Sequence, residues 1–164
     1  MTITASTLAN NSAGSAGALF ANFGQAAVTV SDSTFSGNQA TNTVTGLGGA
    51  IWVGAQAQVY IAGGAITNNP ARFGGGLYLS PSATVTFTSS GAPAVVSGNS
   101  ATRAGGGLYN SLGSVTLANV TLSGNSAHTA DSHVATFGGG VDNYQGTVAV
   151  SDATIVSNTA DLDA

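Results

Sequence analysis

The sequence contains no cysteine, no lysine and no glutamate, and arginine occurs only at Arg72 and Arg103. The absence of cysteine excludes disulfide bonds and thiolate metal sites. Two arginines against six aspartates give a formal net charge of −4. This balance excludes a basic groove for nucleic-acid phosphates and attraction to an anionic membrane surface. No apolar stretch approaches the about 18 residues that a membrane span needs. We therefore expect neither a nucleic-acid partner nor membrane insertion.

What the 164 residues do contain is repetition, together with 24 glycines and 43% hydrophobic residues. A phrase at residues 1–13 places apolar residues in alternation, then a single apolar residue, and then Asn-x-Ala. Further copies begin at Val28, Val59, Val85, Val115 and Val148. A repeat of 26 to 33 residues indicates a solenoid, in which each coil packs mainly against its neighbours.

A second phrase, first rich in glycine and then apolar, lies between these copies. It covers Ala16–Phe20, Gly48–Trp52, Gly74–Tyr78, Gly105–Tyr109 and Gly138–Asp142. Alternating apolar residues are typical of strands, and the many Gly and β-branched residues disfavour helix. Crossovers between parallel strands are nearly always right-handed. We therefore predict an all-β fold, a right-handed parallel β-helix (β-solenoid) of about six coils with three short strands per coil.

Stacked coils would place equivalent side chains in columns, for example Val28 beside Val59 and Val59 beside Val85. One coil alone buries too little apolar surface to offset the conformational entropy of ordering about 27 residues. The coils must therefore fold together, and we expect a single domain over residues 1–164. Because Met1 stands where the repeat has Val, we also expect the chain to be a segment of a longer repeat protein.

One asparagine recurs in every copy of the first phrase. Asn tolerates the left-handed backbone of a tight corner, and its amide can bond to the same amide one coil away. Glycines directly before three of these positions support a turn. We predict a structural ladder that consists of Asn11, Asn38, Asn69, Asn99, Asn125 and Asn158.

Two short motifs resemble a known family. Gly-Gly-Ala-Ile at Gly48–Ile51 and Phe-Ser-Gly-Asn at Phe35–Asn38 are similar to the paired motifs of the polymorphic outer membrane proteins, which are autotransported surface proteins of chlamydial type. They are also similar to those of other bacterial right-handed β-helix repeat proteins. The resemblance implies a secreted or cell-surface passenger with a β-helical stalk that is commonly adhesive.

The acidic residues do not form a recognisable catalytic pair. Asp32 and Asp152 share a repeat position but lie four coils apart, about 19 Å at the strand spacing. Glycoside hydrolysis needs two carboxyl groups much closer than this. Asp161 and Asp163 are neighbours at the end of the chain, where we interpret them as solvated. We expect no catalytic residue, no enzyme activity and no cofactor, and a fragment of a polysaccharide-active β-helix enzyme remains an alternative.

One loop combines side chains that can bind metal. His128, Asp131 and His133 lie within six residues of one another, and imidazole and carboxylate are ligands of zinc and other divalent ions. The signal is weak, because the same residues occur in solvated loops. We keep these three residues as weak metal candidates and predict no metal site.

An aromatic residue follows the inward apolar residue of the second phrase in four coils. Alternation places these side chains outside, where stacked rings could bind sugars through their flat faces. The alternative is a self-stabilising stack, or a strip covered by neighbouring loops, since Phe73 and Phe137 lie just before the same phrase. The candidate ligand-binding residues are Phe20, Trp52, Tyr78 and Tyr109.

The first phrase also directs Thr and Ser outward. Flat Thr arrays resemble the ice-binding faces of some β-solenoid antifreeze proteins, so an ice-binding β-solenoid is a further alternative. Tyr60, Ala62, Ala118 and Ala149 interrupt the array, and Thr is also common in strands for its propensity alone. The columns contain Thr2, Thr4, Thr29, Ser31, Tyr60, Ala62, Thr86, Thr88, Thr116, Ala118, Ala149 and Ser151.

Together these features predict a non-catalytic structural or adhesive segment of a bacterial cell-surface or secreted protein. No signal peptide is recognisable in the sequence, so the extracellular or cell-surface location is expected for the longer parent protein. The expected partner is a host or environmental glycan or a surface protein. Open ladder edges at the two ends also invite head-to-tail self-association.

Overall fold

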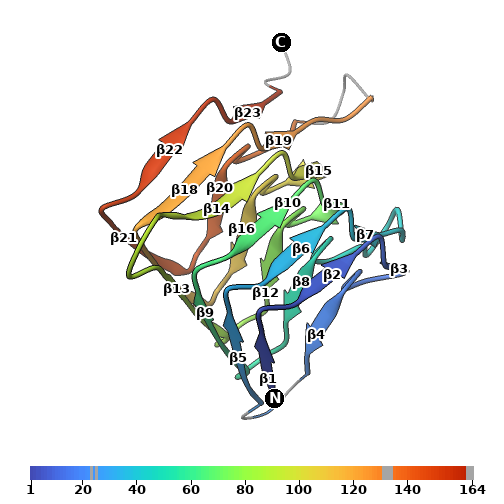
Figure 1. Cartoon of the computed structure of the whole chain (residues 1–164). Helices are drawn as coiled ribbons and strands as arrows, with labels where there is room; N and C mark the ends of the chain where they lie inside the picture. The colour runs from blue at the N-terminus through green and yellow to red at the C-terminus, as the bar shows by residue number, and fades with distance from the viewer. Residues whose placement is uncertain (23, 25, 131–134, 162–164) are drawn as a thin grey trace.

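Successive coils of the chain lie one on another, and each short strand pairs in parallel with the equivalent strand of the next coil (Figure 1). The computed structural model describes residues 1–22, 24, 26–130 and 135–161. These residues form 23 strands with turns and loops between them, and no helix occurs among them. The predicted all-β parallel solenoid is confirmed.

Two sheets run the whole length of the stack. Sheet 1 consists of β1 (Thr2–Thr4), β5 (Ala27–Ser31), β9 (Gln58–Ala62), β13 (Thr84–Thr88), β17 (Ser114–Ala118) and β21 (Thr147–Ser151). Sheet 2 consists of β2 (Thr7–Ala9), β6 (Thr34–Ser36), β10 (Ala65–Thr67), β14 (Ala94–Ser97), β18 (Val120–Ser123) and β22 (Thr154–Val156).

The other two sides of each coil are shorter. Sheet 3 consists of β11 (Pro70–Phe73), β15 (Ser100–Ala104), β19 (Ser126–Ala127) and β23 (Thr159–Ala160), with the pair β3 (Ser12–Ala13) and β7 (Gln39–Ala40) on the same side of the coils (Figure 1). Sheet 4 consists of β4 (Leu19–Ala21), β8 (Ile51–Val53), β12 (Leu77–Leu79), β16 (Leu108–Ser111) and β20 (Val141–Tyr144).

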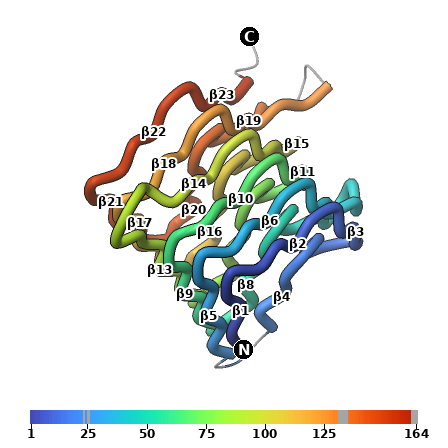
Figure 2. The backbone as a smooth tube through the Cα atoms, viewed as in Figure 1, coloured from blue at the N-terminus to red at the C-terminus, as the bar shows by residue number. Residues whose placement is uncertain are grey.

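A complete coil therefore contains four strands, one on each of its four sides. The strands β1–β4, β5–β8, β9–β12, β13–β16 and β17–β20 form five complete coils, and β21–β23 begin a sixth (Figure 2). This agrees closely with the predicted six coils. Sheet 3 is the strand position that the sequence did not predict, because strands as short as Ser12–Ala13 contain no alternating apolar pattern.

The register between coils follows the repeat. In sheet 1, Val59 pairs with Val28 on one side and with Val85 on the other. Val85 in turn pairs with Val115, and Val115 with Val148. Parallel strands with one buried face fix their register strongly, because a slip of one residue would turn every apolar side chain outward.

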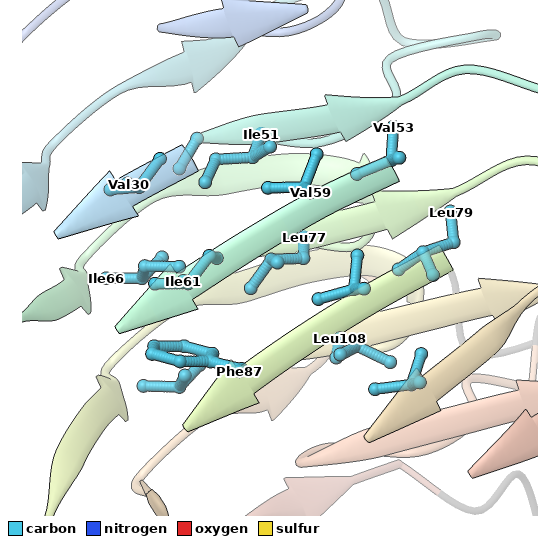
Figure 3. Close-up of a cluster of buried hydrophobic side chains, with 14 of the residues drawn as sticks. Val30, Ile51, Val53, Val59, Ile61, Ile66, Leu77, Leu79, Phe87 and Leu108 are labelled. Atoms are coloured by element: carbon cyan, nitrogen blue, oxygen red, sulfur yellow. The ribbon is translucent and has the colours of Figure 1, made fainter. Parts of the chain in front are cut away.

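The core is the space enclosed by the four sheets. Side chains such as Ile51, Leu77 and Phe87 from different sheets point into it and contact one another (Figure 3). They are fully buried in the middle coils. Burial of each such side chain stabilises the fold by about 1.5–3 kcal/mol. At the C-terminal end, Val150 and Ile155 are about half exposed, at 49% and 50%, because the structure describes no further coil beyond them.

The glycine-rich phrase forms the corner between sheets 3 and 4. Gly74 has a φ of +63°, a left-handed conformation that glycine adopts without strain. At Gly75 the chain passes so close to the next coil that an added Cβ would lie 2.4 Å from the Ser100 carbonyl oxygen and 2.5 Å from that of Gly106. The Gly75 position therefore excludes a side chain. The backbone ladder continues through it, with Gly75 N–H donating to the Gly105 carbonyl.

Candidate functional site

The outward side chains of sheet 4 form a row of aromatic rings, which we call the aromatic strip. Phe20 pairs with Trp52, Trp52 with Tyr78, and Tyr78 with Tyr109. Their strands alternate between buried and more exposed residues, with these rings at the more exposed positions. The parallel pairing of one short strand per coil thus brings together four rings that are far apart in the sequence.

The rings of the strip contact one another directly. Phe20 and Trp52 stack with centroids 4.2 Å apart, and Tyr78 and Tyr109 stack at 5.4 Å with planes only 6° apart. Trp52 and Tyr78 meet edge to face at 6.5 Å. Stacked and edge-to-face pairs of this kind stabilise the fold beyond the area that they bury. The strip therefore holds itself rigid, and its rings remain partly exposed.

Polar groups fix the rings in place. The Trp52 Nε1–H donates to the Ser80 hydroxyl at 2.9 Å. Burial raises the pKa of the Tyr78 hydroxyl above its ordinary value, and a hydrogen bond with Ser111 partly opposes this effect. The pKa of Tyr109 is also raised, first by burial and then by the nearby negative charge of Asp142. Both tyrosines are therefore neutral hydrogen-bonding groups at physiological pH.

Phe73, from sheet 3, flanks the strip. Its ring meets Tyr109 edge to face at 5.3 Å, so one of the two covering rings considered from the sequence does contact the strip. Phe137 is 53% exposed and lies under the Arg103 guanidinium, whose carbon is 5.9 Å from the ring centroid. The strip is thus bordered by rings without being covered by them along its whole length.

The six asparagines of the first phrase form a continuous hydrogen-bonded ladder. The Oδ1 atom of Asn99, for example, accepts from the backbone N–H of Asn69 at 3.0 Å and from Asn69 Nδ2 at 2.8 Å. Asn99 Nδ2 donates both to Asn125 Oδ1 and to the Ile66 carbonyl. The same pattern joins Asn11, Asn38, Asn69, Asn99, Asn125 and Asn158. No buried side-chain N or O atom in the described part of the chain lacks a partner, so the ladder offers no free group to a ligand.

One detail of the ladder differs from the expectation. The left-handed backbone conformation does not occur at the ladder asparagines but at the residue before each of them. Asn10 and Asn68 have φ of 57°, and Gly37 and Gly98 have φ of 64° and 62°. The turn is made one residue earlier because the ladder asparagine must direct its amide inward, along the stack.

Sequence reasoning missed a second, shorter asparagine contact. Asn110 Nδ2 donates to Asn143 Oδ1 at 2.8 Å, and Asn110 Oδ1 accepts from the Gly113 N–H. The signal was present in the sequence, since each of these residues lies two positions after the inward apolar residue of the second phrase. This contact holds the turn between sheets 4 and 1.

The metal candidates are only partly within the described residues. His128 is exposed, and its Nδ1 atom contacts Oδ2 of Asp161. Asp131 and His133 lie outside the described residues. Within the described residues, no group of three or more His, Cys, Asp or Glu side chains is placed to hold a metal ion.

The remaining candidates lie apart from one another. Asp32 follows β5 and Asp152 follows β21, and β9, β13 and β17 separate these strands in sheet 1. The outward Thr and Ser columns of sheet 1 are in the predicted register, for example Thr29 beside Thr2. Tyr60 interrupts them, and its hydroxyl accepts a hydrogen bond from Thr88 at 3.3 Å.

Part of the chain matches a known protein family. The family model for the Chlamydia polymorphic membrane protein (Chlamydia_PMP) repeat matches residues 32–54 and 93–111. Each segment contains one strand of sheet 2, one ladder asparagine, the glycine-rich corner and one strand of sheet 4. The resemblance expected from the motifs is confirmed for these two segments. Comparison with curated proteins and with solved structures gives no significant match. In the described part of the chain, no helix has the length and hydrophobicity that a membrane span requires.

Proposed function

We propose that this chain is a non-catalytic, adhesive β-solenoid segment of a bacterial protein at the cell surface or outside the cell, and that its aromatic strip binds glycans. The match to a polymorphic membrane protein repeat in two coils supports the cellular location. The aromatic strip is the single observation that supports the binding function.

The strip suits a sugar chain for physical reasons. Tyrosine and tryptophan combine apolar ring atoms with a polar O–H or N–H group, which matches the apolar C–H face and the hydroxyl edge of a pyranose. Neighbouring coils are about 4.8 Å apart, so the rings form a continuous platform for an extended ligand. Because the rings already contact one another, little side-chain entropy is lost on binding.

The competing functions have less support. Catalysis on a polysaccharide needs two carboxyl groups at short range, and Asp32 and Asp152 are separated by three intervening strands. Ice binding needs a flat, regular array, and Tyr60 lies across it. Self-association is the second candidate, favoured by the half-exposed Val150, Ile155 and Val156 of β21 and β22.

A glycan array probed with wild type and variants tests the proposal. The Trp52→Ala variant should lower the affinity for the bound glycans about tenfold or more, because the loss of a stacking ring costs on the order of 1.4 kcal/mol or more. Trp52→Phe keeps a ring in the strip and should retain most of the binding.

Tyr60→Ala is the control, since Tyr60 is an exposed aromatic residue on sheet 1 rather than sheet 4. It should leave the binding profile unchanged. Equal binding by wild type and Trp52→Ala, or the absence of any bound glycan, would contradict the proposal. Circular dichroism of each variant verifies that the solenoid is intact.

A further inference from the structure

A hollow of about 440 Å³ opens at one end of the aromatic strip. It is bordered by Phe73 of β11, Arg103 and Ala104 of β15, Tyr109 of β16, Asp142 of β20, and Phe137. Its volume is within the range of small-molecule sites, about 300–1,000 Å³. The hollow is therefore large enough for one small ring.

Two departures from the repeat coincide at this place. In the column that precedes the glycine-rich corner, Leu47 pairs with Phe73, Phe73 with Ala104, and Ala104 with Phe137. A methyl group thus stands between two phenylalanines whose backbones are two strand spacings, about 9.6 Å, apart. Ala104 is itself only 2% exposed, and together with Phe73 and Phe137 it lines the hollow.

The second departure lies in the adjacent column. The aromatic strip continues from Tyr109 to Asp142, which takes the position of a fifth ring. Asp142 is about half-buried, and burial raises the pKa of its carboxyl group above the ordinary value. The structure gives this side chain no hydrogen bond and no ion pair with any other described residue. A partner that donates hydrogen bonds would relieve this desolvation.

Arg103 supplies the complementary group. Its Nη1 atom donates to the Ala135 carbonyl at 2.9 Å, and its guanidinium lies over the Phe137 ring. These contacts hold the side chain at the rim of the hollow. A guanidinium has five N–H donors, so donors remain beyond the one bound to Ala135.

These groups select a class of ligand. Aromatic walls favour a ring with apolar faces, Asp142 accepts hydrogen bonds from hydroxyl groups, and Arg103 donates them. One positive and one negative side chain leave the hollow without net charge. The carboxylate of an acidic sugar would be attracted by Arg103 and repelled by Asp142, and the ammonium of an amino sugar would be attracted by Asp142 and repelled by Arg103. A charge on the sugar therefore brings little net electrostatic gain.

We propose that this hollow is a binding seat for a single neutral pyranose unit, which packs between Phe73 and Phe137, donates hydroxyl hydrogen bonds to Asp142 and accepts one from Arg103. The inference deepens the proposed function and rests on it, because Tyr109 belongs both to the strip and to the hollow. The seat would fix one sugar unit and thereby the register of the glycan along the strip.

The decisive variant is Ala104→Phe. It restores a ring to the column that already holds Phe73 and Phe137. The ring would occupy space in the hollow beside Tyr109, while Phe20, Trp52 and Tyr78, which do not line the hollow, stay unchanged. Thr102→Phe is the matched control, because Thr102 is an exposed residue of the same strand and does not line the hollow. A second variant, Asp142→Asn, removes the charge and keeps the size of the side chain.

Binding is measured by saturation-transfer NMR and titration with methyl glucoside, methyl galactoside, methyl mannoside, methyl glucuronide and glucosamine, and with the oligosaccharides retained on the array. Wild type should bind a neutral glycoside. Ala104→Phe should weaken this binding about tenfold or more, and Asp142→Asn about tenfold, as expected for the loss of hydrogen bonds to a charged group. Thr102→Phe should bind as wild type does.

The outcomes separate the two proposals. If Trp52→Ala weakens binding while Ala104→Phe and Asp142→Asn do not, the proposed pyranose site in the hollow is wrong and glycan binding by the strip is supported. If only the variants in the hollow weaken binding, glycan binding by the strip is wrong and the pyranose site in the hollow is supported. A preference for the glucuronide or for glucosamine overturns the assignment of a neutral sugar. If neither a glycoside nor an oligosaccharide binds to wild type, both proposals fail.

Discussion

Asn99 shows what a single residue contributes to this fold. Its side chain is fully buried, yet both ends of the amide have partners in the neighbouring coils. A buried amide is costly without such partners and stabilising with them. Since its amide bonds to the same group above and below, the same residue type recurs in every coil, and for that reason the ladder could be predicted from the sequence.

Replacement of Asn99 by alanine should lower the free energy of unfolding by roughly 3–5 kcal/mol. It removes four side-chain hydrogen bonds and leaves the backbone N–H of Asn69 without its acceptor. Asn158→Ala is the matched control, because Asn158 occupies the last position of the ladder and is only partly buried. Urea denaturation of both variants measures the difference. Equal losses at the two positions would show that the ladder is not a cooperative buried network.

The hollow at Ala104 and Asp142 shows the limit of prediction at the scale of residues. Both departures are visible when the repeats are aligned. From the second copy of the second phrase onward, the residue before its first glycine is Leu47, Phe73, Ala104 or Phe137, so Ala104 stands out as the small one. Asp142 stands out in the same way, because it follows the inward apolar residue where other coils have an aromatic ring. The alignment does not show that the two columns face each other. That contact depends on how the corner between sheets 3 and 4 folds.

Among the elements, the glycine-rich corner decides how closely the coils approach. The three-glycine segments continue the backbone ladder between sheets 3 and 4, with Gly75 N–H and Gly106 N–H donating to carbonyls of the next coil. The short strands of sheet 4, and with them the aromatic strip, are positioned by these corners. The sequence indicated a turn here, and the close approach of backbones explains why the middle position of the corner, occupied for example by Gly49, Gly75 and Gly106, is glycine.

Gly75→Ala should destabilise the protein by about 1–3 kcal/mol or more, because the added methyl group would overlap the carbonyl oxygens of Ser100 and Gly106. Gly91→Ala serves as the comparison, since a Cβ at this exposed loop position meets nothing within 4 Å. It should be neutral or slightly stabilising. Thermal unfolding of the two variants measures both effects, and a harmless Gly75→Ala would refute the close approach at the corner.

Over the whole molecule, burial is uneven along the axis of the stack. The inward residues of the middle coils are fully buried, and Ile3 and Leu19 of the first coil are 8% and 6% exposed. Inward residues of the last strands, such as Val150 and Ile155, are about half exposed. In a solenoid each coil is stabilised mainly by its neighbours, so the stability should decrease toward this end.

Hydrogen exchange tests this gradient. Amides of β21 and β22 should exchange faster than those of β9, β13 and β17, which lie between two paired strands. The difference in exchange rate between these two groups of strands should be largest in dilute protein, where self-association is weakest. Protection of β21 and β22 that increases with protein concentration would instead support self-association through this end, and uniform protection at all concentrations would contradict the gradient.

The sequence by itself determined the fold class, the inward columns and the asparagine ladder. It could do so because a repeat places like residues in neighbouring coils, and parallel pairing turns this spacing into direct contact. Only the tertiary structure decided the fourth strand of each coil, the position of the left-handed turn, the contact between Phe73 and Tyr109, and the hollow beside Asp142. These features depend on contacts around a coil rather than along the stack. Contacts around a coil are set by the geometry of the corners, which the repeat pattern does not determine.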